Sequence, residues 1–380
     1  MMRKLWMLLA LLLLCSPALA ENVRLEPANE LLPEDWAAVW LVDDDTVLVG
    51  YNAADLPSRE LVNLTTGERI PVTLHEDFVP VGSKLAKRFP EMALREGFPM
   101  ESGLRFAGSS RYVFLSSPAV GFYVDRENGA MQSIRAEGLV FGNGVGMTPW
   151  HHVYSTGEST VRVYPLLGNC LGLYRVETGA CVAGVIPVEE GFLIVTLRDP
   201  VRLDPEKNPI LVGYTMRLVL ADKQLNVVAE RELGGIPYVN RFFNGYRCEG
   251  TGAFLLSPDM YAGALLITPE WDVYSLAEVS GELQMVPYED TFEVAEGMYA
   301  ACAYVVGMAD DGSYALVHQL YEGLYRIELS TLEVTLQMTY EELEALGVTG
   351  KRRLMWPGGE YVDAGGEMLL RIVPAPEMTD

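Results

Sequence analysis

The chain has 380 residues and carries 52 acidic against 28 basic side chains, a formal net charge of −24. A protein this acidic repels nucleic-acid phosphates and anionic membrane surfaces, so we expect neither as a partner. The length suits either two ordinary domains or one large β domain built from repeats.

Residues 1–20 have the three parts of a secretory signal peptide. Arg3 and Lys4 form the charged start, residues 5–14 an apolar core, and residues 18–20 a small-x-small cleavage site. The apolar core is too short for a membrane span, which needs about twenty residues. We therefore expect cleavage before Glu21, a mature chain of residues 21–380, and a secreted or periplasmic bacterial protein without membrane insertion.

Strand signals begin soon after that site. Residues 38–51 (AVWLVDDDTVLVGY) hold two apolar runs around three aspartates, which predicts a hairpin, and residues 60–70 predict the next strand. The aspartates lack the spacing of a calcium loop, so we expect no metal there. The chain then mixes basic and apolar residues without the period of two that a strand shows, which predicts a helical insertion near residues 82–97.

From residue 104 the strand rhythm resumes and continues to the end of the chain. Turn and strand signals recur in five units, before a final segment at residues 354–373 that holds only two strands. The units are residues 104–134, 160–185, 192–233, 251–278 and 308–338. Residues 308–338 are the most regular unit, with predicted strands at 314–319, 324–329 and 334–338, followed by a short helix near residues 340–346.

The spacing of these units indicates the architecture. Equivalent apolar positions recur 45 to 61 residues apart, at Leu61, Phe122, Leu173, Leu218, Leu265 and Leu324. A period near fifty with about four short strands per unit is typical of a β-propeller. We predict an all-β, seven-bladed propeller of four-stranded antiparallel blades, with six or eight blades left open. Residues 23–32 are expected to complete the last blade and close the ring.

Two repeats also resemble a known class. GMADDGSYALVHQL followed by GLYRIELSTLEV is similar to repeats of exported bacterial WD40-like and TolB-like propellers. Their pattern places a Pro-Asp-Gly turn before one strand and Asp-x-x-Thr-Gly after an aromatic-basic-aliphatic strand. Asp311-Gly312 and Thr178-Gly179 match it, whereas Met260 replaces the glycine after Pro258-Asp259. The resemblance implies a fold and leaves the activity open.

Motifs for catalysis and for cofactors are missing from the sequence. There is no Gly-x-Ser-x-Gly elbow, no pair of histidines at metalloprotease spacing, and no Cys-x-x-Cys pair. We expect no metal and no cofactor. Four cysteines remain after cleavage, and they permit either two disulfides or buried free thiols. They are Cys170, Cys181, Cys248 and Cys302.

Two clusters interrupt the repeat pattern and are the candidate ligand-binding residues. Aromatic rings and guanidinium groups are enriched at binding sites, because they offer contact area and fixed hydrogen bonding. The clusters are Trp150, His151, His152 and Tyr154, and Arg352, Arg353 and Trp356.

We predict a monomeric, non-catalytic propeller that binds a peptide, protein or glycan on one face. A first alternative is a carbohydrate-active enzyme, a glycosidase or lyase, that uses carboxylates in the central channel. A second is a structural module of an envelope assembly.

Overall fold

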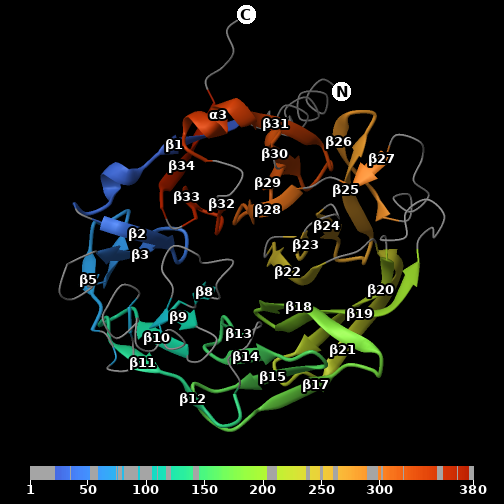
Figure 1. The fold of residues 1–380 in the computed structure, drawn as a ribbon, viewed down its shortest axis with the longest axis horizontal. Coiled ribbons are helices and arrows are strands. Elements are labelled where there is room, and N and C mark those ends of the chain that lie inside the picture. The colour runs from blue at the N-terminus through green and yellow to red at the C-terminus, as the bar shows by residue number, and fades with distance from the viewer. Residues whose placement is uncertain are drawn as a thin grey trace, which may run out of the picture.

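A computed structural model describes residues 22–34, 36–51, 59–73, 75, 79–80, 93–94, 105–108, 110–116, 121–139, 145–202, 212–236, 240–248, 251–259, 264–288, 298–300, 303–319, 321–348, 354–365 and 367–375. Across these residues almost all regular structure is β-strand, and no helix is long and apolar enough to cross a membrane. Seven antiparallel sheets surround a central axis (Figure 1). The chain is a seven-bladed β-propeller, as predicted.

Each blade has four strands, which we letter A to D from the axis outwards. The first three blades consist of β2 (Trp36–Leu41), β3 (Thr46–Tyr51), β4 (Arg59–Asn63) and β5 (Arg69–Pro71); β8 (Arg105–Gly108), β9 (Tyr112–Ser116), β10 (Gly121–Asp125) and β11 (Met131–Ser133); and β13 (Val145–Met147), β14 (Val153–Thr156), β15 (Thr160–Tyr164) and β17 (Gly172–Arg175).

The next three blades contain the longest strands. They consist of β18 (Ala180–Val188), β19 (Gly191–Arg202), β20 (Val212–Asp222) and β21 (Val227–Ile236); β22 (Asn240–Arg247), β23 (Phe254–Asp259), β24 (Leu265–Ile267) and β25 (Val273–Val279); and β28 (Ala303–Met308), β29 (Tyr314–Gln319), β30 (Gly323–Glu328) and β31 (Val334–Thr339). The fifth sheet is extended by β26 (Glu282–Pro287) and β27 (Met298–Ala300), which both pair with β25.

The seventh blade joins the two ends of the described chain. It contains β32 (Leu354–Met355), β33 (Tyr361–Ala364), β34 (Leu369–Pro374) and β1 (Val23–Pro27). Strand β1 pairs antiparallel with β34, with Leu25 opposite Ile372. The prediction that an N-terminal strand closes the ring is therefore confirmed.

The predicted repeat positions fall in third strands with one exception. Leu173 lies in the fourth strand, β17, because the third blade begins at Val145 and not at residue 160. Its first strand, β13, has only three residues and includes Gly146, so it gave too weak a strand signal to be recognised.

Short elements connect the blades. The predicted short helix is α3 (Tyr340–Ala345), which begins at a capping box formed by Thr339 and Glu342. A single 3-10 turn, η1 (Asn29–Leu31), follows β1, and β12 (Arg135–Ala136) pairs in parallel with β16 (Leu167–Gly168). Of the predicted insertion near residues 82–97, only Ala93–Leu94 is described; it forms β7, parallel to β6 (Val79–Pro80). The rest of that segment lies outside the described residues.

The core is divided among the spaces between neighbouring blades. Seven buried apolar clusters occupy the seven interfaces. Successive side chains of a strand point to opposite faces of its sheet, so Phe192 and Ile194 pack toward the third blade while Leu193 and Val195 pack toward the fifth. Burial on both faces explains why the strands read as continuous apolar runs.

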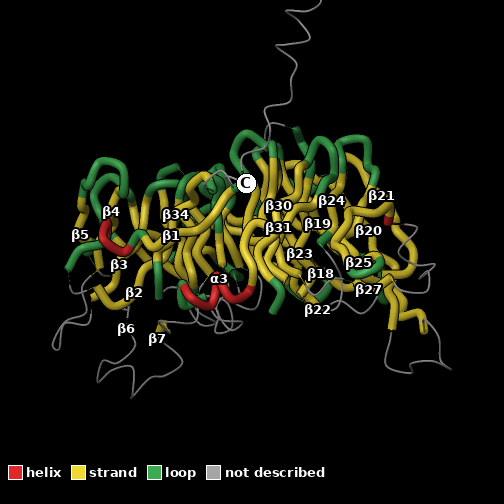
Figure 2. Tube along the Cα trace, turned by 90° about the horizontal axis from the view of Figure 1, so that it is seen from above, coloured by secondary structure: helices red, strands yellow, loops and turns green. Residues whose placement is uncertain are grey.

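The strand topology determines on which face of the disc each turn lies. Because strands within a blade alternate in direction, the A–B turns and the C–D turns lie together on one face of the disc, which we call the A–B face. The B–C turns and helix α3 lie on the opposite face, and Figure 2 shows the disc from the side.

Candidate functional site

The first predicted cluster lies in the A–B turn of the third blade and, for Tyr154, in the strand β14 that follows this turn. Thr148 shapes this turn: its backbone N–H donates to the His152 carbonyl (2.8 Å), and its hydroxyl accepts from the His152 N–H (3.0 Å). Trp150 is half-buried and meets the Phe192 ring edge-on, with centroids 5.3 Å apart. The Lys223 ammonium lies 4.8 Å from the Trp150 ring centroid. Trp150 therefore packs against the fourth blade.

The neighbouring side chains contact other partners. His151 has a left-handed backbone (φ 64°), and its ring meets Tyr112 of the second blade edge-on at 5.4 Å. Nδ1 of His152 lies 2.9 Å from the Trp150 carbonyl oxygen. Tyr154 is half-buried against Phe192 (5.9 Å). The described part of the chain contains no group of three or more side chains placed to hold a metal ion.

Trp356 lies in a different part of the ring, at the interface of the sixth and seventh blades. Only 2% of its surface is exposed, its ring stacks on Tyr314 at 5.3 Å, and its Nε1 donates to the Gly359 carbonyl (2.7 Å). Arg352 and Arg353 lie outside the described residues. The structure thus brings the four residues of the first cluster together. Trp356 directly follows β32, which lies across the ring from β13 and β14 (Figure 1). Ligand binding by these residues stays a prediction.

A more open site lies at the C–D turns, most of which share one design. In five of the seven blades the last-but-one residue of this turn adopts a left-handed backbone, and in the fourth, fifth and sixth blades it is Leu225 (φ 66°), Trp271 (φ 67°) and Leu332 (φ 62°). The first two blades have Gly67 and Gly129 there. A side chain in this conformation costs about 1 kcal/mol, so its packing must offset the strain.

The packing of these three side chains differs. Leu225 is 4% exposed and fills the interface of the third and fourth blades. Leu332 is half-buried against the cluster between the fifth and sixth blades. Trp271 is also half-buried, against the cluster between the fourth and fifth blades, but a groove of about 390 Å³ remains beside it.

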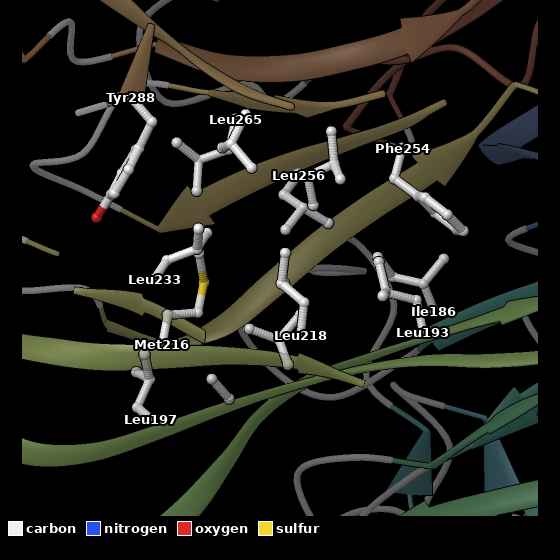
Figure 3. Close-up of a cluster of buried hydrophobic side chains, with 14 of the residues drawn as sticks. Ile186, Leu193, Leu197, Met216, Leu218, Leu233, Phe254, Leu256, Leu265 and Tyr288 are labelled. Carbon is white, nitrogen blue, oxygen red and sulfur yellow. The ribbon is translucent and has the colours of Figure 1, made fainter. Parts of the chain in front are cut away.

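This groove has apolar walls from two blades. Val188, Leu220 and Val228 come from the fourth blade, and Phe254, Ile267 and Trp271 from the fifth. Below it the two blades are tightly packed: in Figure 3, Met216 and Leu218 face Leu256 and Leu265. A volume of this size is within the range of small-ligand pockets, about 300–1,000 Å³. We call it the 4/5 groove.

Charged groups lie at the rim of the 4/5 groove. Arg247 of the fifth blade pairs with Glu190 of the fourth through two contacts, one of 3.2 Å, and its guanidinium lies 5.8 Å from the Phe254 ring centroid. The hydrogen bond from Arg247 lowers the pKa of Glu190. Asp222 accepts bonds from Asn226 and Gln224 at 2.9 Å, which lower its pKa. Both groups are carboxylates at neutral pH.

A pair of carboxyl groups on the same face bears on the enzyme alternative. The pKa of Asp44 is raised to about 6 by burial, by the charge and hydrogen bond of Asp310, and by the charge of Asp43. A backbone hydrogen bond from Gly359 acts in the opposite direction and lowers this pKa. The A–B turns of the first, sixth and seventh blades therefore meet here. Because Asp44 and Asp310 are hydrogen-bonded to each other, their carboxyl groups are closer than those of glycosidases, which are separated by about 5 to 9.5 Å. The spacing of this pair therefore differs from that of the glycosidase mechanisms.

Sequence reasoning missed Trp271, although a signal existed. Thr268-Pro-Glu-Trp-Asp272 repeats the pattern of Thr148-Pro-Trp-His-His152. In both turns the threonine N–H donates to the carbonyl four residues on, and its hydroxyl accepts the N–H of that same residue. In the second turn these distances are 2.9 and 3.1 Å. The shared Thr-Pro start was therefore a sequence signal that these two segments form turns of the same type.

The comparisons with known proteins show similarity at the level of overall shape. No family model matches the chain, and no curated protein matches its sequence. The β-propeller domain of Cps50 (Swd1) from Myceliophteria thermophila aligns over 93% of this chain and all of that domain, at 11% identity and a TM-score of 0.49. The computationally designed protein Ika8 aligns over 89% of this chain and 83% of its own, at 11% identity and a TM-score of 0.43. Hydrazine synthase from Kuenenia stuttgartiensis aligns over 89% and 94%, at 11% identity and a TM-score of 0.41.

Proposed function

We propose that this propeller is a non-catalytic binding module that holds a peptide, protein or glycan on its A–B face. The observation that supports this most is the 4/5 groove, where a tryptophan in a strained turn leaves apolar walls open to solvent. Strained backbone concentrates at functional sites, and aromatic side chains dominate binding energies. Trp150 lies on the same face, one blade interface away, and extends the proposed surface.

The test uses residues 21–380 on peptide and glycan arrays. Trp271→Ala should abolish binding to the ligands that the wild-type protein selects. Tyr321→Ala is the matched control, because Tyr321 is likewise an aromatic residue with a left-handed backbone, and it is exposed (70%) on the opposite face. Equal binding by wild-type and Trp271→Ala, or loss of binding only in Tyr321→Ala, would contradict the proposal.

The proposal includes export of the protein. Its support is the signal-like sequence of residues 1–20, with Arg3 and Lys4 ahead of the apolar core. Expression of the full chain in a bacterial host followed by N-terminal sequencing of the extracytoplasmic protein should give Glu21 as the first residue. Recovery of the uncleaved chain inside the cell would contradict export.

The enzyme alternative draws its support from Asp44, whose pKa of about 6 is suited to a general acid. Hydrolysis of an array-selected glycan by the wild-type protein, lost in Asp44→Asn and in Asp310→Asn but retained in Trp271→Ala, would favour that alternative. Glycan binding without release of product favours the binding module.

A further inference from the structure

We propose that the 4/5 groove receives a peptide segment in which one large apolar side chain is followed by lysine or arginine. This inference rests on the proposed function, since it names the ligand class of the same site. It combines two observations: the walls of the groove are apolar, and its rim carries more negative than positive charge.

The walls define the apolar part of the ligand. Val228, on the outermost strand of the fourth blade, is 71% exposed, and Trp271 lines the same groove from the fifth blade. A monomer gains nothing from leaving such side chains in water, whereas a partner's aromatic or branched side chain would cover both. The volume of about 390 Å³ accommodates a single aromatic side chain with part of its backbone.

The rim defines the charged part. Glu190 and Asp222 line the groove, and Glu270 and Asp272 flank Trp271 in the same turn, both exposed. The one basic lining residue, Arg247, is bonded to Glu190. Nearby Lys223 lies 3.9 Å from Glu189 and also contacts the Trp150 ring. The rim therefore keeps an excess of carboxylates, and complementary charge on a partner would be positive.

The polar groups in the walls suit a peptide better than a glycan. Sugar recognition needs several side-chain donors and acceptors directed at the ligand. Here the Thr268 hydroxyl already accepts the Asp272 N–H, and the Asp222 carboxylate already accepts the Asn226 N–H of its own turn. An anionic ligand would meet the carboxylate excess. The remaining fit is an apolar anchor beside a cation, with the backbone of the segment running along the rim.

The experiment measures binding of three capped peptides to residues 21–380 by isothermal titration at 50 mM NaCl. Their central residues are Phe-Arg, Phe-Glu and Ser-Arg, each between acetyl-Gly and Gly-amide. We expect the Phe-Arg peptide to bind at least tenfold more tightly than either of the others, and its affinity to fall severalfold at 500 mM NaCl because the rim charges are screened. Trp271→Ala should abolish binding of all three.

A charge variant separates the two parts of the proposal. Glu270→Gln combined with Asp272→Asn should reduce the preference for Phe-Arg over Phe-Glu to threefold or less, without loss of Phe-Glu binding. Glu341→Gln combined with Glu344→Gln removes the same charge on helix α3 and should leave the preference unchanged.

The outcomes distinguish the ligand class from the function. Equal affinity for Phe-Arg and Phe-Glu overturns the charge part, and equal affinity for Phe-Arg and Ser-Arg overturns the apolar part. If none of the peptides binds, the ligand class is wrong, while array ligands lost in Trp271→Ala would still support the binding module. If Phe-Arg binding survives Trp271→Ala, the groove is not the site.

Discussion

Trp356 and Trp271 both lie at blade interfaces on the A–B face, but their surroundings differ. Trp356 lies between the sixth and seventh blades, where its backbone N–H donates to Val306 (2.8 Å), its ring stacks on Tyr314 and its indole N–H is bonded. Trp271 lies between the fourth and fifth blades, half-buried, with a groove beside it. The same residue type therefore closes one interface and leaves the other open, which separates a structural role from a binding role.

Truncation of each tryptophan should reveal this difference. Trp356→Ala should lower the free energy of unfolding by about 3 to 5 kcal/mol, because it empties a buried site. Trp271→Ala should lower it by about 1 kcal/mol or less, because a half-buried side chain loses less packing. Urea unfolding followed by circular dichroism measures both. Equal destabilisation by the two variants would remove the distinction between closed and open interfaces.

The folding stability should also depend on pH through His318, which lies at the interface of the sixth and seventh blades. This histidine is 1% exposed, and its Nδ1 lies 2.7 Å from the Tyr304 hydroxyl, which accepts the Leu354 N–H across the blade interface (3.0 Å). Burial lowers the pKa of His318 to about 4. Between pH 6.5 and 4 the unfolded chain thus binds a proton that the folded protein excludes, so stability is full above pH 6.5 and falls below it, by up to about 3 kcal/mol.

The contribution of His318 is the difference between wild-type and His318→Gln in urea unfolding at pH 7 and pH 4.5. Such a comparison also removes the effect of Asp44, whose raised pKa acts in the opposite direction: its contribution is present below pH 3.8 and disappears as the pH rises through about 6. Parallel pH profiles for the two proteins would rule out His318 as the acid-sensitive group.

Substitution of two glycines by alanine should change the free energy of unfolding by smaller amounts. A Cβ on Gly307 would lie 1.8 Å from the Trp356 carbonyl oxygen, so Gly307→Ala must push the sixth and seventh blades apart and should cost about 2 to 3 kcal/mol. At Gly252, in the lining of the 4/5 groove, the nearest atom is Pro269 Cγ at 3.7 Å, and only the positive φ (73°) is unfavourable. Gly252→Ala should cost about 1 kcal/mol. Thermal unfolding of both variants tests this order, and a larger cost at Gly252 would contradict it.

Much of the fold was accessible from the sequence, because each blade repeats the same strand and turn signals. Residues 314–319 were predicted as a strand and form β29, and the role of β1 in closing the ring followed from the missing strands of the last unit. The start of the third blade was missed, since β13 is short and contains Gly146.

The site was less accessible. Trp150, Trp271 and Trp356 all read as aromatic residues near turns, and nothing in a single sequence says which of them a neighbouring blade covers. Burial depends on residues far along the chain: Tyr314 stacks on Trp356, whereas Val228 and Trp271 line an open groove. Only the ring arrangement of the blades determines this.

The most direct test of the 4/5 groove uses fluorine NMR of protein labelled with 5-fluorotryptophan. The chain has six tryptophans, and the Trp271 resonance can be assigned with Trp271→Phe. Addition of the Phe-Arg peptide should shift the Trp271 resonance in a saturable manner and leave the Trp356 resonance unchanged. A Trp271 resonance that stays in place while the peptide is bound would contradict the claim that this groove is the binding site.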